Sequence, residues 1–232
     1  MGESCFPAGR AVMPTRPGSP IPGSSWTNLR HWHPAPNPAP GSARCPPGWP
    51  ALDLTAIGMF GHSLGGATAA KAMAADARIG AGIDLDGSLF LLNPSLPLDP
   101  RKAGAAVGRR IGSRPFMIMS SHGFGPRDDP SWRGFWPSLR GWRLFLTMRH
   151  SQHYTYTDLE EFLSQLVAAG TIPGRLATRL VNPAIGTVNP ARAVAAERAY
   201  ISAFFDLHLR GRASKLLGHP SPDFPDIQFP GR

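Results

Sequence analysis

Apolar residues gather in four short runs between residues 56 and 148, and glycine, proline or polar residues bound each run. Runs of this length predict strands, and a near-continuous apolar run such as the third is typical of a strand buried on both faces of a parallel sheet. The predicted strands are 56–61, 79–85, 114–121 and 142–148.

Helical segments are predicted between these strands. Small residues over Leu64–Ala75 predict a helix that can pack closely on a sheet, and Trp132–Leu139 predicts a short helix. Strands that alternate with helices favour a mainly parallel sheet with right-handed crossovers, so the sequence predicts the α/β fold class.

Cap residues mark two further helices. Thr157, followed by Glu160 three residues later, predicts a capping box at a helix N-terminus. The apolar stripe of that helix is formed by Phe162, Leu163, Leu166 and Val167. The last helix is predicted to open at Asn189, with a proline in its first turn, and to end near Gly211.

The first fifty residues differ in composition from the rest of the chain. Twelve of the 26 prolines lie in 1–50, and no apolar periodicity runs through this segment. Proline removes backbone donors and blocks helices, so 1–50 is expected to be irregular or disordered. The predicted α/β domain then occupies 51–215, and the proline-containing segment 216–232 is expected to form an irregular tail.

Charge and composition exclude several functions. The formal net charge of +9 comes mainly from arginines that are scattered, without a basic run, so we expect no nucleic-acid binding. The sequence contains no run of eighteen apolar residues, which a transmembrane helix would need. No apolar leader is visible at the N-terminus, and the sequence leaves the localisation unknown. The two cysteines, Cys5 and Cys45, are too few for a disulfide framework or a zinc site.

The turn between the first predicted strand and the first predicted helix has the pattern G-x-S-x-G, formed by Gly61, Ser63 and Gly65. A nucleophilic serine stands on a strained strand-to-helix turn, and Gly61 and Gly65 remove side chains that would crowd the backbone there. The helix that begins at Leu64 would aim N–H groups at the reacting carbonyl oxygen. The sequence therefore predicts Ser63 as a nucleophile and the Leu64 N–H as an oxyanion-hole donor.

A serine nucleophile requires a base, and a carboxylate that orients the base. The acid candidates follow the second and third predicted strands and are Asp84, Asp86, Asp128 and Asp129. The base candidates follow the fourth predicted strand and are His150 and His153, whereas a structural role is expected for His62 and His122. The chain order Ser, Asp, His is that of an α/β-hydrolase. The residues alone leave these alternatives open.

Three segments carry a further pattern: Gly61–Thr68, Gly82–Asp86, and Ser151–His153 followed by Asp158. Together they resemble the platelet-activating-factor acetylhydrolase family, of the plasma and isoform II type, and its bacterial lipase-like relatives. The resemblance covers about residues 52–215 and implies an α/β-hydrolase fold. It selects Asp86 as the acid and His153 as the base that act with Ser63.

The same resemblance implies hydrolysis of carboxylic esters through an acyl-enzyme, with short acyl chains on phospholipids or related esters. A broader lipase or a cutinase-like polyester hydrolase is the alternative on the same fold. The resemblance implies no metal and no organic cofactor, and contact with a lipid–water interface would suit such substrates.

The sequence departs from this pattern before residue 56. A complete α/β-hydrolase has about four strands ahead of the serine turn, whereas this chain has a proline-rich segment there. We therefore expect the first strands and the second oxyanion-hole donor to be missing, and the edge of the strand before Ser63 to be exposed. The resulting hypothesis is a truncated or frame-disturbed gene product, for which a catalytically impaired remnant is the alternative function.

Overall fold

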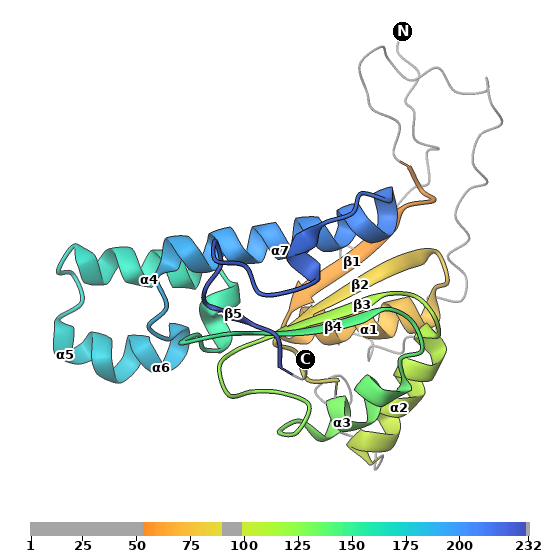
Figure 1. Ribbon diagram of the computed structural model, residues 1–232. Helices are drawn as coiled ribbons and strands as arrows, with labels where there is room; N and C mark the ends of the chain where they lie inside the picture. Colours follow the sequence, from red (N-terminus) through yellow and green to blue (C-terminus); the bar gives the residue numbers. More distant parts are fainter. Residues whose placement is uncertain (1–52, 90–98, 231–232) are drawn as a thin grey trace, which may run out of the picture. The chain divides into compact units, whose positions relative to one another are not determined.

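The computed structural model describes residues 53–89 and 99–230, so the predicted irregular segment 1–50 lies outside the described residues. They contain a five-stranded sheet in the order β1-β2-β3-β4-β5 (Figure 1). The parallel strands are β1 (Ile57–His62), β2 (Ile79–Leu85), β3 (Phe116–Ser120) and β4 (Arg143–Met148). Each lies within two residues of its predicted bounds, which confirms the mainly parallel α/β fold.

Helices cover both faces of the sheet (Figure 1). The helices on one face are α1 (Leu64–Ala75), α2 (Pro100–Ile111) and α3 (Pro130–Ser138). The other face is covered by α7 (Pro190–Arg210). In β3, the Ile118 side chain packs in the core under α1, α2 and α3, and the Met119 side chain packs in the core under α7. This burial on both faces explains why the strand reads as a continuous apolar run.

The sequence pattern does not predict α2, because its two glycines lower the helix propensity of the segment. These glycines allow α3 to approach closely, since a Cβ on Gly104 would collide with the carbonyl oxygen of Ser131. Asp99 caps the helix by accepting a hydrogen bond from the Arg101 N–H at 2.9 Å. Packing against α3 therefore outweighs the weak intrinsic propensity.

A group of short helices follows β4 and extends away from the sheet (Figure 1). They are the 3-10 helix η3 (His153–Tyr156), α4 (Leu159–Ala168), α5 (Gly174–Leu176), the π-helix η4 (Ala177–Val181) and α6 (Asn182–Ile185). No helix among the described residues is long and apolar enough to span a bilayer.

The predicted capping box of α4 is wrong. Thr157 is the C-cap of η3, and Asp158 occupies the N-cap of α4 without a side-chain cap hydrogen bond. The reciprocal pair forms one turn earlier, between Gln152 and Thr155. Glu160, the expected partner in the box, is buried and 1 % exposed.

The apolar stripe predicted for α4 is only partly buried. Leu163 and Val167 pack against a small core formed with the segment from η4 to α6, whereas Phe162 is 56 % exposed.

The last helix agrees with its prediction. The Asn189 side chain accepts a hydrogen bond from the Arg192 N–H at 3.1 Å, and α7 ends at Gly211, which has a left-handed φ of 66°. The segment 216–232, expected to be irregular, also contributes β5 (Ile227–Gln228), which pairs antiparallel with β4. Two residues carry no readable periodicity, which is why the sequence does not predict this strand.

At the opposite edge of the sheet, β1 pairs with β2 alone among the described residues. The Phe60 side chain of β1 is 51 % exposed. The carboxyl ends of β1 to β4 lie at one edge of the sheet, where the loops that carry the predicted site residues begin.

Candidate active site

Ser63 stands on the turn between β1 and α1 with a positive φ of 56°. Its N–H donates to the Leu85 carbonyl oxygen at 2.8 Å, which ties the turn to β2. A positive φ is strained for a residue other than glycine, and such strain is typical of functional turns. Ser63 therefore has the strand–turn–helix setting that the G-x-S-x-G pattern requires.

The glycines around Ser63 differ in how crowded they are. A Cβ on Gly61 would lie 2.5 Å from the Gly65 carbonyl carbon, whereas a Cβ on Gly65 would have no neighbour within 4 Å. The crowding after Ser63 arises at Gly66, where a Cβ would collide with Asp84 Oδ1. The expectation that a side chain at position 65 would crowd the turn is therefore wrong. The glycine required for steric reasons after Ser63 is Gly66.

His153 begins η3, and its ring lies between the side chains of Ser63 and Asp86. His153 Nε2 is 2.9 Å from Ser63 Oγ, and His153 Nδ1 is 2.7 Å from Asp86 Oδ2. The Asp86 side chain is 2 % exposed and that of His153 is 41 % exposed. A buried carboxylate beside Nδ1 favours the tautomer with its proton on Nδ1, which leaves Nε2 able to accept the serine proton.

Asp86 follows β2 and has a φ of 55°. Its Oδ1 accepts hydrogen bonds from the Ser121 N–H at 2.7 Å and the Ser121 hydroxyl at 2.9 Å. Its own N–H donates to the Met119 carbonyl oxygen at 2.8 Å. Sequence reasoning missed Ser121, although its place after β3, the neighbour of β2, could have indicated that it meets Asp86.

The other acid candidates lie outside this hydrogen-bonded series. Asp84 is fully buried, and its Oδ1 accepts from the Gly87 N–H at 2.8 Å. Asp129 caps α3 by accepting from the Trp132 N–H at 2.9 Å, and Asp128 is exposed. Of the four carboxylates considered, the structure places Asp86 beside His153.

The remaining histidines divide in the same way. His150 has a φ of 60°, and its ring stacks on that of His122 with the centroids 5.9 Å apart. His62, expected to be structural, forms a hydrogen bond between its Nε2 and the His153 carbonyl oxygen at 2.8 Å. Burial lowers the pKa of His62, which favours the neutral ring, and its Nε2–H then donates to that carbonyl. His62 thus holds the backbone of His153.

Leu64 is the first residue of α1 and is 51 % exposed. Its N–H belongs to the first turn of the helix, where backbone N–H groups have no partner within the helix. The oxyanion-hole role of this N–H stays a prediction. Among the described residues, no cluster of three or more His, Cys, Asp or Glu side chains could hold a metal ion.

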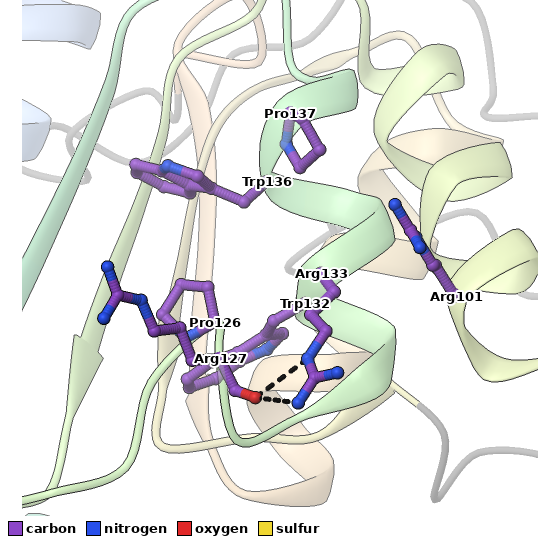
Figure 2. A pocket seen from close by; sticks show the side chains of 7 residues that line it. All are labelled: Arg101, Pro126, Arg127, Trp132, Arg133, Trp136 and Pro137. Atoms are coloured by element: carbon purple, nitrogen blue, oxygen red, sulfur yellow. Dashed lines mark hydrogen bonds between the residues drawn. The ribbon is translucent and has the colours of Figure 1, made fainter.

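A hollow of about 580 Å³ lies beside α3 and is also lined by the start of α2 and the loop before α3. Figure 2 shows its lining residues Arg101, Pro126, Arg127, Trp132, Arg133, Trp136 and Pro137. The three guanidinium groups do not converge on one point, and that of Arg133 donates to the Arg127 carbonyl oxygen at 2.8 Å (Figure 2). Ser63, Asp86 and His153 are not among its lining residues, so this hollow is separate from the serine turn.

Comparison with known proteins identifies esterases. The chain is 27 % identical over 182 residues to a "Probable 1-alkyl-2-acetylglycerophosphocholine esterase" of Arthroderma benhamiae, a match that covers 75 % of this chain and 43 % of the relative. The structure of this chain is similar to that of a ferulic acid esterase from Streptomyces cinnamoneus, with a TM-score of 0.62. The two are 34 % identical, and the match covers 80 % of this chain and 50 % of the esterase. No family model matches the chain.

These likenesses confirm the resemblance to the platelet-activating-factor acetylhydrolase family and the α/β-hydrolase fold. The chain spans about half the length of these two relatives.

Proposed function

We propose that this chain is a serine hydrolase of carboxylic esters in which Ser63 is the nucleophile, His153 the base and Asp86 the residue that orients the base. The observation that carries the proposal is the continuous series of hydrogen bonds from Ser63 Oγ through the His153 ring to Asp86 Oδ2. A serine hydroxyl is a weak nucleophile at neutral pH, and this arrangement is the one that activates it.

The reaction follows from these contacts. His153 Nε2 takes the hydroxyl proton while Ser63 Oγ attacks the ester carbonyl carbon, and the carbonyl electron pair moves onto its oxygen. The intermediate collapses as the bond to the alcohol oxygen breaks, and His153 gives its proton to the leaving alcohol. Water then attacks the acyl-enzyme in the same way, which releases the acid and restores the Ser63 hydroxyl.

The Leu64 N–H is the proposed donor to the oxygen that becomes negative. It lies in the first turn of α1, at the end of the helix where the dipole favours negative charge. Loss of one oxyanion-hole donor typically lowers kcat by about 10²–10³-fold. A single donor would therefore support a slow reaction, and a second N–H would be needed for full activity.

The proposed substrates are esters with short acyl chains on phospholipids or related alcohols. The curated relative is named as an esterase of 1-alkyl-2-acetylglycerophosphocholine, which carries an acetyl ester and favours an acetyl group as the substrate's acyl chain. The structural relative is named for ferulic acid, which favours an aromatic acid as the second candidate. A series of p-nitrophenyl esters of rising chain length, with methyl ferulate beside it, separates the two and also identifies a broader lipase.

The first test is labelling of the full chain with a fluorophosphonate, which reacts with activated serines. We expect labelling of the wild type and its loss in Ser63→Ala, because no other hydroxyl is proposed to be activated. Ser113→Ala is the matched control, since Ser113 is exposed at the turn before β3 and should not change labelling. Folded wild-type protein that is not labelled would contradict the proposal and favour a catalytically impaired remnant.

A further inference from the structure

Asp84 lies beneath the serine turn and has no part in the proposed proton transfer. It is on β2 and is 0 % exposed. Its Oδ1 accepts the Gly87 N–H at 2.8 Å, whereas its Oδ2 has no hydrogen-bond partner among the described residues. A buried carboxylate with one oxygen unpaired is costly, so the position requires an explanation.

The Asp84 carboxyl group fills the space between two glycines of the site. A Cβ on Gly66, in the first turn of α1, would collide with Asp84 Oδ1. A Cβ on Gly87 would collide both with Asp84 Oδ1 and with the Ser63 carbonyl oxygen. The carboxyl group therefore touches the helix that follows the nucleophile and the turn that follows Asp86.

The charge on Asp84 is governed by its surroundings. Burial raises the pKa of Asp84 well above its ordinary value, and the neighbouring carboxylates of Asp86 and Asp129 raise it further. The Gly87 N–H lowers this pKa, but by less than burial raises it.

We propose that Asp84 is a positioning residue that acts as an uncharged carboxylic acid, fixing the Gly87 backbone and through it the turn that aims Asp86 at His153. The proposal rests on the proposed esterase function. Asp86 has a φ of 55°, so its backbone is strained and needs external support. Asp84 gives this support from one side through Gly87, and Ser121 gives it from the other through the Asp86 carboxylate.

Two variants separate the acceptor oxygen from the shape of the side chain. Asp84→Asn keeps the shape, the absence of charge and an oxygen that can accept the Gly87 N–H. Asp84→Leu has a similar size but leaves that N–H unpaired. Both are measured as the full chain, by the rate of fluorophosphonate labelling at Ser63 and by kcat and KM for p-nitrophenyl acetate.

We expect D84N to label within about 3-fold of the wild type and D84L to lose about 10- to 100-fold in kcat with KM unchanged, because small misplacements of a catalytic group have effects of this size. A difference infrared spectrum of wild type minus D84N should contain the C=O stretch of a protonated carboxylic acid. This band reports the protonation of Asp84 even where D84L does not fold.

The outcomes distinguish this proposal from the one on which it rests. Wild-type protein that is not labelled overturns the esterase function, and the positioning role with it. Labelled wild type with D84L equally active overturns the positioning role alone. D84N that is folded but as slow as D84L would show that the carboxylate charge is required, and a spectrum without the protonated-acid band would show that Asp84 is ionised. Either result overturns the uncharged acid.

Discussion

Three buried aspartates near the serine turn differ in what each carboxyl group accepts. Asp86 accepts from Ser121 and meets the His153 ring, so the direction of its carboxyl group is fixed. Asp129 accepts from backbone and side-chain donors at the start of α3 and acts as a helix cap. Asp84 has one backbone donor. Hydrogen-bond partners, rather than position in the sequence, therefore assign the role of each acid.

The glycines that contact Asp84 lead to a prediction about stability. Gly66→Ala should lower the free energy of unfolding by about 1–3 kcal/mol, because the added Cβ collides with the Asp84 carboxyl group and overpacks the site. Gly65→Ala is the matched control, since its Cβ meets no atom within 4 Å. Thermal unfolding of both variants checks this, and equal losses of Tm would contradict the steric assignment.

At the scale of the element, α4 shows why a cap pattern can mislead. The T-x-x-E pattern is satisfied in the sequence, but Thr157 is the C-cap of η3 and α4 begins after Asp158. Glu160 then faces inward, and its Oε2 is buried without a partner among the described residues. Burial, together with the neighbouring Glu161, raises the pKa of Glu160 to about 7.

This pKa predicts how stability depends on pH. Below the ordinary glutamate pKa of 4.5, Glu160 is protonated in both the folded and the unfolded chain, so its titration takes nothing from the free energy of unfolding there. Between pH 4.5 and about 7, Glu160 loses its proton in the unfolded chain but keeps it in the folded chain, so each rise in pH favours the unfolded chain. Above about pH 7 the folded chain loses the proton as well and then holds a buried charge. The free energy of unfolding should therefore fall by about 1–3 kcal/mol between pH 5 and pH 8.

Glu160→Gln should remove most of this fall, because glutamine has no proton to lose. Urea unfolding at several pH values measures the effect. The control is Glu161→Gln, which changes an exposed neighbour and is expected to alter stability by less than about 0.5 kcal/mol. The same pH dependence in wild type and Glu160→Gln would show that Glu160 is not the titrating group.

At the scale of the whole molecule, the sequence predicts the parallel sheet well because its strands read as short apolar runs, and the inner strands β2 and β3 are buried along most of their length. The strand–turn–helix around Ser63 and the caps of α7 were also readable, since they depend on neighbouring residues alone. Tertiary packing decides the rest. α2 needs the close approach of α3, β5 needs β4 beside it, and Ser121 and His62 enter the site only when strands and loops distant in sequence meet.

The C-terminal strand connects the far end of the chain to the loop that carries His153. The Arg149 N–H, just after β4, donates to the Asp226 carbonyl oxygen at 2.8 Å, and the Asp226 carboxylate forms an ion pair with Arg192 of α7. Ile227 is 3 % exposed and packs in the core shared with α7. The residues after α7 thus complete one core of the sheet.

Ile227→Ala should therefore lower the free energy of unfolding by about 2–5 kcal/mol, through lost burial and the cavity that remains. For a domain of this size the loss corresponds to a fall in Tm of about 4–20 °C. Gln228→Ala is the matched control, because Gln228 is exposed on the same strand and should change Tm little. If both variants unfold at the wild-type temperature, the C-terminal strand adds nothing to the stability of the sheet.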